Sequence, residues 1–88
     1  MRSRATARFR RLLDELPEAT RRAAQQSFAL FKDNPSHPSL QFKRVKERPE
    51  LYSARVSLTC RALAQREGDS LIWFWLGSHD EYERLIAR

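Results

Sequence analysis

The first third of the chain repeats its apolar residues with the spacing of an α-helix. From Thr6 to Leu16 they occupy positions i, i+3, i+4 and i+7 starting at Phe9, so one face of this helix is apolar. Pro17 ends the helix, and a second amphipathic helix is predicted over residues 18–33. Its apolar face consists of Ala19, Ala23, Ala24, Phe28 and Phe31. Two helices joined this closely predict an antiparallel hairpin that covers another apolar surface.

Beyond the helices, apolar and polar residues alternate as they do in β-strands. Residues 34–38 include two prolines, which cannot continue the second helix. The alternation then predicts a first strand at residues 40–43, a second at 52–58 and a third at 60–64, with a tight bend near residues 58–59. These short spacings favour an antiparallel sheet.

The last part of the chain predicts an interior strand and a short helix. Residues 71–76 are apolar on both strand faces, which is typical of a strand with neighbours on both sides. A hairpin turn at Glu67-Gly68-Asp69 precedes this strand. Strand alternation places Trp73 and Trp75 on one face, where we assign both to the core. A final helix is predicted over residues 80–87.

The elements therefore follow in the order α-α-β-β-β-β-α and predict a single α+β domain over residues 1–88. An N-terminal helical hairpin should pack on a twisted antiparallel sheet of three to four strands, followed by the short C-terminal helix. Residues 1–5 lack periodicity, and we expect them to be a flexible start.

Composition narrows the possible partners. The formal net charge of +6 favours a polyanionic partner, although charge alone leaves RNA, DNA, an anionic membrane and an acidic protein open. Cys60 is the single cysteine, which excludes an internal disulfide and fits a reducing cytoplasm. The start lacks the apolar segment of a secretory signal, and the longest apolar run is too short to span a bilayer. We therefore expect a cytoplasmic protein with no membrane partner.

Several basic residues could contact nucleic acid. Those that follow the first predicted strand are Lys43, Arg44, Lys46 and Arg48, which could equally belong to a solvated loop. Arg55 stands beside Ser53 and Ser57 on the more polar strand face, where its guanidinium could bind a phosphate through two hydrogen bonds. Arg61 could contact phosphate or pair with acceptors at the edge of the core.

Two further residues could exchange protons or contact a base. His79 follows the last strand, and Tyr82 lies about one helical turn later. The alternative interpretation is a helix-capping histidine and a packed tyrosine. His37, which lies between two prolines, is interpreted as structural. The sequence contains no glycine-rich phosphate loop, no GxSxG motif and no zinc or magnesium ligand set, so we expect metal-free chemistry without a cofactor.

Three segments together resemble the RelE/ParE superfamily of toxins from bacterial type II toxin–antitoxin pairs. They are NPSHPSLQFKRV (residues 34–45), LYSARVSLTCRAL (51–63) and IWFWLGSHDEYERLI (72–86). The forms HPSLxFK and GSHxEY are similar to the subset described as cytotoxic translational repressors. The resemblance implies a RelE-like fold and an antitoxin partner that binds the toxin in a hetero-oligomeric complex.

In the ribosome-dependent branch, the resemblance implies an endoribonuclease that cleaves mRNA in the ribosomal A site and inhibits translation. The 2′-hydroxyl attacks the adjacent phosphate, which gives a 2′,3′-cyclic phosphate and a 5′-hydroxyl. By this resemblance Lys43 orients the phosphate or acts as a base, as does Lys46, and Arg55 stabilises the transition state. His79 is implied as the general acid, and Tyr82 stacks on a base or helps to deprotonate the nucleophile.

The charge cluster and the resemblance together give an expected RNA-binding set, and this chain departs from the family pattern at two positions. The set is Lys43, Arg44, Lys46, Arg48 and Arg61, although the last is often structural in relatives. Cys60 replaces a tyrosine that is usual in relatives, and His79 stands where an arginine is common. Two other functions stay open: a ParE-like poison of DNA gyrase without catalytic activity, and a degenerate toxin that acts only as an antitoxin-bound corepressor.

Overall fold

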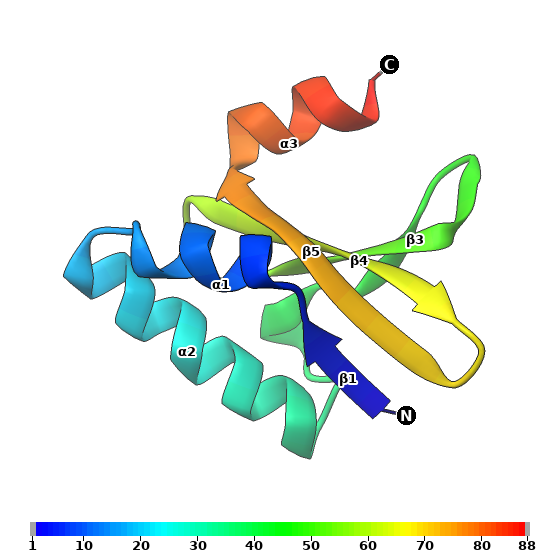
Figure 1. Cartoon of the computed structure of the whole chain (residues 1–88), viewed down its shortest axis with the longest axis horizontal. Helices are drawn as coiled ribbons and strands as arrows, with labels where there is room; N and C mark the ends of the chain where they lie inside the picture. The colour runs from blue at the N-terminus through cyan, green and yellow to red at the C-terminus, as the bar shows by residue number, and fades with distance from the viewer. Residues whose placement is uncertain (1, 88) are drawn as a thin grey trace.

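Five strands form one sheet in the computed structural model, which describes residues 2–87 (Figure 1). The elements are β1 (Arg2–Ala5), α1 (Ala7–Asp14), α2 (Glu18–Asp33), the 3₁₀ helix η1 (Pro38–Leu40), β2 (Lys43–Val45), β3 (Arg48–Arg55), β4 (Cys60–Glu67), β5 (Ser70–Ser78) and α3 (His79–Ile86). The strand order across the sheet is β1-β5-β4-β3-β2. The α+β class, the N-terminal helical hairpin and the short C-terminal helix are confirmed.

Both predicted N-terminal helices are present. α2 has the predicted bounds, since a proline precedes it and another follows its end closely. α1 is shorter than predicted and begins after Thr6, whose hydroxyl accepts a hydrogen bond from the Phe9 backbone N–H at 3.1 Å. Ala19, which the spacing places on the apolar face, is exposed in the first turn of α2.

The start of the chain differs from the prediction. Residues 2–5 form strand β1 instead of a flexible start, and β1 runs parallel to β5 with Arg2 opposite Ser70. The Trp73 indole N–H donates to Ser3 Oγ at 2.9 Å across 70 positions of sequence. Pairing over such a separation has no local periodic signal. The sheet is therefore mixed and five-stranded, instead of antiparallel with three to four strands; Met1 lies outside the described residues.

The first predicted strand is also displaced. Leu40 belongs to η1, and β2 begins only at Lys43. η1 forms because Pro38 favours a helical first position and the His37 ring accepts a hydrogen bond from the Ser39 backbone N–H at 3.2 Å. The alternation around residue 40 thus reflects a 3₁₀ turn with a buried leucine, and His37 has the structural role expected of it.

β5 lies between β1 and β4, which confirms the prediction of an interior strand. Its pairing with β4 contains an irregularity that leaves Phe74 as an extra residue, between the partners of Leu63 and Ala64. Because of this bulge, the residues before and after Phe74 point to opposite sides of the sheet. Trp73 and Trp75 therefore contact different parts of the core, and the prediction that they share one face is wrong.

The core is divided between the two sides of the sheet. The larger part lies under α1 and α2, where the rings of Phe31 and Trp73 meet edge-on with centroids 5.4 Å apart. The smaller part, on the other side, consists of Val45, Leu63, Trp75 and Tyr82. α3 supplies the tyrosine and stands at the end of β5, away from the helical hairpin (Figure 1). This second side of the sheet is called the site face below.

Candidate functional site

Three of the predicted site residues project from the sheet onto the site face. The antiparallel register sets Arg55 of β3 directly opposite Arg61 of β4, which is itself opposite Gly77 of β5. Ser53, two residues before Arg55 in β3, lies opposite Lys43 of β2. Directly opposed residues of neighbouring strands point to the same side of a sheet. The intervening small residues of β3 and β4 belong to the core under the helical hairpin.

Arg61 is buried in the site face, with only 5% of its surface exposed. Its Nη1 donates to Gln41 Oε1 at 3.1 Å, and Nη2 donates to Ser53 Oγ at 3.1 Å and to the Gln41 carbonyl oxygen at 3.4 Å. Its Nε has no hydrogen-bond partner, and no carboxylate of residues 2–87 forms a salt bridge with it. Arg61 therefore keeps an uncompensated positive charge next to Arg55. The expected RNA-binding role would require an exposed side chain, whereas the Arg61 side chain is buried.

The Tyr82 ring contacts the buried guanidinium of Arg61 on the same side of the sheet. The guanidinium carbon of Arg61 lies 5.1 Å from the centroid of the Tyr82 ring, a cation–π contact. The ring is 4% exposed and packs with Leu63 and Trp75. It offers no free face to an incoming base, so the stacking role that the resemblance implies does not fit this geometry. Here the ring positions Arg61.

His79 is the first residue of α3 and is exposed at the edge of the site face. Its backbone N–H donates to the Thr59 carbonyl at 2.9 Å, which joins the helix to the β3–β4 bend. The ring Nε2 lies 3.3 Å from Glu83 Oε1, and the ring centroid is 6.4 Å from that of Tyr82. No hydrogen bond within residues 2–87 involves Nδ1. The imidazole can thus exchange a proton with a molecule bound on this face.

The position of His79 is fixed by the residues around it. Ser78 Oγ accepts a hydrogen bond from the Glu81 backbone N–H, and the Glu81 carboxylate accepts one from the Ser78 backbone N–H, both at 3.1 Å. The backbone and side-chain hydrogen bonds of Ser78 hold the pKa of Glu81 below its usual value. A Cβ atom at Gly77 would clash with the Trp75 ring, so this position favours glycine.

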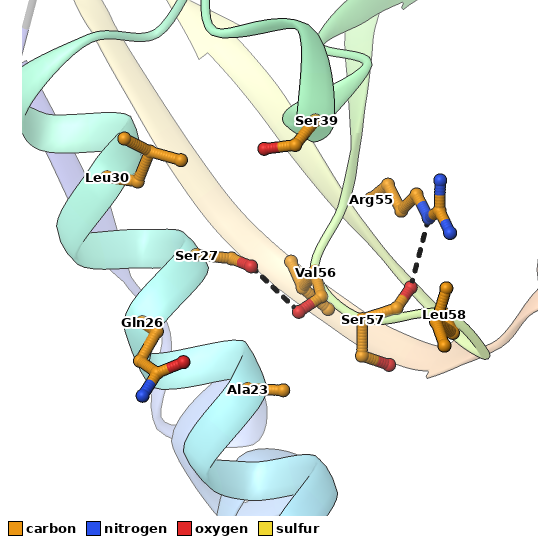
Figure 2. Close-up of a pocket in the computed structure, with 9 residues that line it drawn as sticks. All are labelled: Ala23, Gln26, Ser27, Leu30, Ser39, Arg55, Val56, Ser57 and Leu58. Atoms are coloured by element: carbon orange, nitrogen blue, oxygen red, sulfur yellow. Dashed lines mark hydrogen bonds between the residues drawn. The ribbon is translucent and has the colours of Figure 1, made fainter.

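Arg55 is half-buried at the end of β3. Figure 2 shows its guanidinium directed away from α2, with Nε donating to the Ser57 carbonyl at 3.4 Å. A cavity of about 380 Å³ lies between α2 and the residues after β3, where Ser27 Oγ donates to the Val56 carbonyl at 2.9 Å. Leu58, at the rim of this cavity, is 86% exposed. Arg55 thus borders both the cavity and the site face.

The four basic residues around β2 do not form one surface. Lys43 is exposed on the site face, whereas Arg44 points to the other side and donates from Nη2 to Tyr52 Oη at 3.1 Å. Lys46 is exposed in the β2–β3 turn, and Arg48 begins β3 in a half-buried position. Consecutive strand residues point to opposite sides, so the single cluster suggested by the sequence is divided between them.

Two residues complete the site without having been predicted. Ser53 is fully buried and accepts from Arg61. A serine between apolar neighbours in a predicted strand was a usable signal for a buried polar contact. Gln41 adopts a left-handed backbone conformation with φ 46°, which directs both its carbonyl and its side chain to Arg61. Nothing in the sequence pattern indicates this conformation for a glutamine.

Two features are absent from the part of the chain that the structure describes: a metal-binding cluster and a membrane-spanning helix. Over residues 2–87, no group of three or more histidine, cysteine, aspartate or glutamate side chains could hold a metal ion. In the same part of the chain, no helix has both the length and the apolar character needed to cross a membrane.

Comparison with known proteins identifies one matching family. A family model described as "ParE-like toxin domain" matches residues 18–84. This match covers most of the chain, including β2 to β5 and nearly all of α3. No curated protein sequence is significantly similar to that of this chain.

Solved structures share the fold at low sequence identity. The toxin–antitoxin complex RelB-RelE from Methanococcus jannaschii matches with a TM-score of 0.71 and 16% identity over 92% of this chain and 95% of that one. The complex RelBE2 from Mycobacterium tuberculosis matches at 0.68 and 22% identity, over 89% and 96% of the two chains. The isolated E. coli RelE toxin matches at 0.64 and 13% identity, over 99% and 96%.

Proposed function

The chain belongs to the ParE-like toxin domain family of the RelE/ParE superfamily, and we propose that it is the toxin of a toxin–antitoxin pair that cleaves mRNA on the ribosome. One observation carries this proposal. Arg61 is a buried cation without a carboxylate partner among residues 2–87, directly opposite the more exposed Arg55 on the site face. Cations at two directly opposed strand positions repel each other, and an anion bound between them relieves that repulsion.

A phosphodiester is the anion that the surrounding groups fit best. Its charge increases in the transition state of cleavage, and preorganised cations stabilise that state more than the bound substrate. Arg55 would contact the phosphate directly. Arg61 would act from the floor of the site, held in place by Ser53, Gln41 and Tyr82.

The remaining groups provide proton transfer. In the proposed reaction the 2′-oxygen bonds to phosphorus, the bond from phosphorus to the 5′-oxygen breaks, and a 2′,3′-cyclic phosphate remains. His79 would protonate the departing 5′-oxygen, because imidazole exchanges protons near neutral pH. Lys43, exposed on the same face, would as an ammonium orient the phosphate while the 2′-hydroxyl proton passes to water, or would as the neutral amine accept that proton itself. All of these groups belong to the chain, and the proposed reaction needs no cofactor.

We also propose that an antitoxin binds this chain in the cytoplasm. The support is the family membership and the charge of +6 on 88 residues, which favours an acidic partner segment. The similar structures from M. jannaschii and M. tuberculosis are themselves toxin–antitoxin complexes.

The experiment that tests the function is induction of the chain in bacteria without an antitoxin. Incorporation of labelled amino acids and of labelled thymidine is followed over time, and mRNA ends are mapped. The proposal expects amino-acid incorporation to stop first, with new mRNA ends that carry 5′-hydroxyl groups. Intact transcripts together with an early stop in DNA synthesis would instead support a gyrase poison.

A further inference from the structure

A second cationic and aromatic cluster lies on the side of the sheet opposite the site face. The rings of Phe42 and Tyr52 stack with centroids 5.3 Å apart and an interplanar angle of 16°. Arg44 donates from Nη2 to Tyr52 Oη at 3.1 Å, and its guanidinium carbon lies 5.6 Å from the centroid of that ring. The register confirms the side, since Tyr52 is opposite Ala64 in the core under the helical hairpin.

Arg66 of β4 lies on the same side of the sheet, because it is two residues beyond Ala64, the partner of Tyr52. The hydrogen bond from Arg44, and then the proximity of Arg66, lower the pKa of the Tyr52 phenol. Both arginines are exposed, and Arg66 Nε donates to the Gly68 carbonyl at 3.0 Å. The acidic group that acts on Arg44 is Glu50, which is exposed as well. A phenol oxygen that accepts from a guanidinium group keeps its own O–H free to donate to an anion.

We propose that Arg44, Tyr52 and Arg66 bind a phosphate group of single-stranded RNA, as a second RNA contact distinct from the cleavage site. Two guanidinium groups and one phenol O–H converge there, which matches the acceptor oxygens of a phosphodiester. The exposed guanidinium of Arg44, which lies over the half-buried Tyr52 ring, offers a plane on which a neighbouring base can stack. An acidic peptide would use the charge of the arginines but would not need this plane.

This proposal rests on RNA as the substrate class and adds a second point of attachment. The cluster and the site face lie on opposite sides of one sheet and approach each other only at its edge strand β2. The second contact would therefore hold nucleotides other than those at the cleaved bond. Its contribution should appear in affinity for RNA and should not depend on cleavage.

The test is fluorescence anisotropy of the full chain with a fluorescein-labelled single-stranded oligouridylate. The double variant Arg44→Gln/Arg66→Gln should bind about tenfold more weakly than the control Arg8→Gln/Arg11→Gln, which removes the same charge from exposed positions of α1. Loss of two phosphate contacts should also reduce the slope of log affinity against log salt by about 1.4. Tyr52→Phe keeps the ring stack and should weaken binding by about three- to tenfold.

Equal RNA affinity and equal salt slope in the double variant and the control would overturn the proposal. It would also be overturned if the double variant kept its RNA affinity but lost affinity for an acidic peptide, because the cluster would then be a protein-binding surface. Failure of the proposed function looks different. In that case the parent chain cleaves no mRNA, while the double variant still binds RNA more weakly than the control.

Discussion

Replacing Arg61 by methionine separates the contribution of its charge from that of its volume. Methionine is unbranched and of similar length, so it can fill the space above the Tyr82 ring and beside Ser53. The charge and the three hydrogen bonds to Gln41 and Ser53 are lost. We expect stability to change little and RNA cleavage to fall strongly.

The stability estimate follows from the contacts. Ser53 Oγ is fully buried and loses its donor, at a cost of about 1–3 kcal/mol. Loss of the contact between the guanidinium and the Tyr82 ring costs about 1–2 kcal/mol. Replacing a buried charge by an apolar side chain of similar volume returns about 1–4 kcal/mol. The acceptors of Gln41 can bond to water, since this residue is exposed. The net change in unfolding free energy should therefore lie between a gain of about 2 and a loss of about 4 kcal/mol, centred on a loss of about 1 kcal/mol.

In contrast to its small effect on stability, Arg61→Met should lower the rate of RNA cleavage strongly. Loss of a preorganised charge that acts on the transition state typically lowers the rate by about 10²–10³-fold. Urea unfolding followed by fluorescence of the buried Trp73 and Trp75 measures stability, and single-turnover cleavage on programmed ribosomes measures activity. Adding Ser53→Ala to Arg61→Met should restore about 1 kcal/mol, because it removes the unsatisfied hydroxyl. Arg8→Met, on the exposed surface of α1, is the matched control.

Two results would refute this reasoning. A loss of more than about 4 kcal/mol in Arg61→Met would show that the guanidinium is chiefly a structural element of the core. Cleavage at the parental rate by a folded Arg61→Met variant would show that the buried charge does not act on the phosphate.

Three further variants test the end of β5 and the start of α3. His79→Ala should lower the single-turnover cleavage rate by about 10²–10⁴-fold without changing the unfolding midpoint, and a parental rate would remove His79 from the proposed proton transfer. Gly77→Ala places a methyl group against the Trp75 ring and should cost about 1–3 kcal/mol in urea unfolding, whereas an unchanged midpoint would show that the ring moves freely. Ser78→Ala removes the helix cap and should cost about 0.5–2 kcal/mol. Because the pKa of Glu81 is lowered in the folded state, its contribution to stability is present above the usual value of 4.5 and is lost as pH falls through the folded value. Ser78→Ala keeps the Ser78 backbone N–H that bonds the Glu81 carboxylate, so its unfolding should lose only part of the pH dependence below about 4.5. An unchanged pH dependence would show that the Ser78 side chain does not contribute to the lowered pKa.

The sequence predicted those elements whose signals are local. α2 has its predicted bounds because prolines lie close to both of its ends, and β5 is interior because its run of apolar residues requires burial on both faces. The missed features depend on distant partners. β1 exists through pairing with β5 at the other end of the chain, and the bulge at Phe74 appears only once β4 is aligned. A period-two pattern contains neither piece of information.

In the candidate site, too, some features follow from local patterns and others depend on distant residues. Strand alternation was sufficient to place Arg55 on a polar face, and the end of the last strand was sufficient to place His79 next to the final helix. Alternation should also have separated Lys43 from Arg44, which the charge pattern grouped together. For Arg61, the alternative of pairing with acceptors at the edge of the core is the one that the structure has. The identity of these acceptors could not be predicted, because it depends on the left-handed backbone of Gln41.

The most direct test of the central claim is single-turnover cleavage of mRNA on programmed ribosomes by the parent chain and by Arg55→Ala, with Arg8→Ala as the matched control. Each variant is first shown to unfold at the parental urea concentration. The proposed function predicts that the parent and the control leave 2′,3′-cyclic phosphate and 5′-hydroxyl ends at the same rate. Arg55→Ala should be slower by about 10²–10³-fold. A folded Arg55→Ala variant that cleaves at the parental rate, or a parent chain that leaves the mRNA intact, would contradict it.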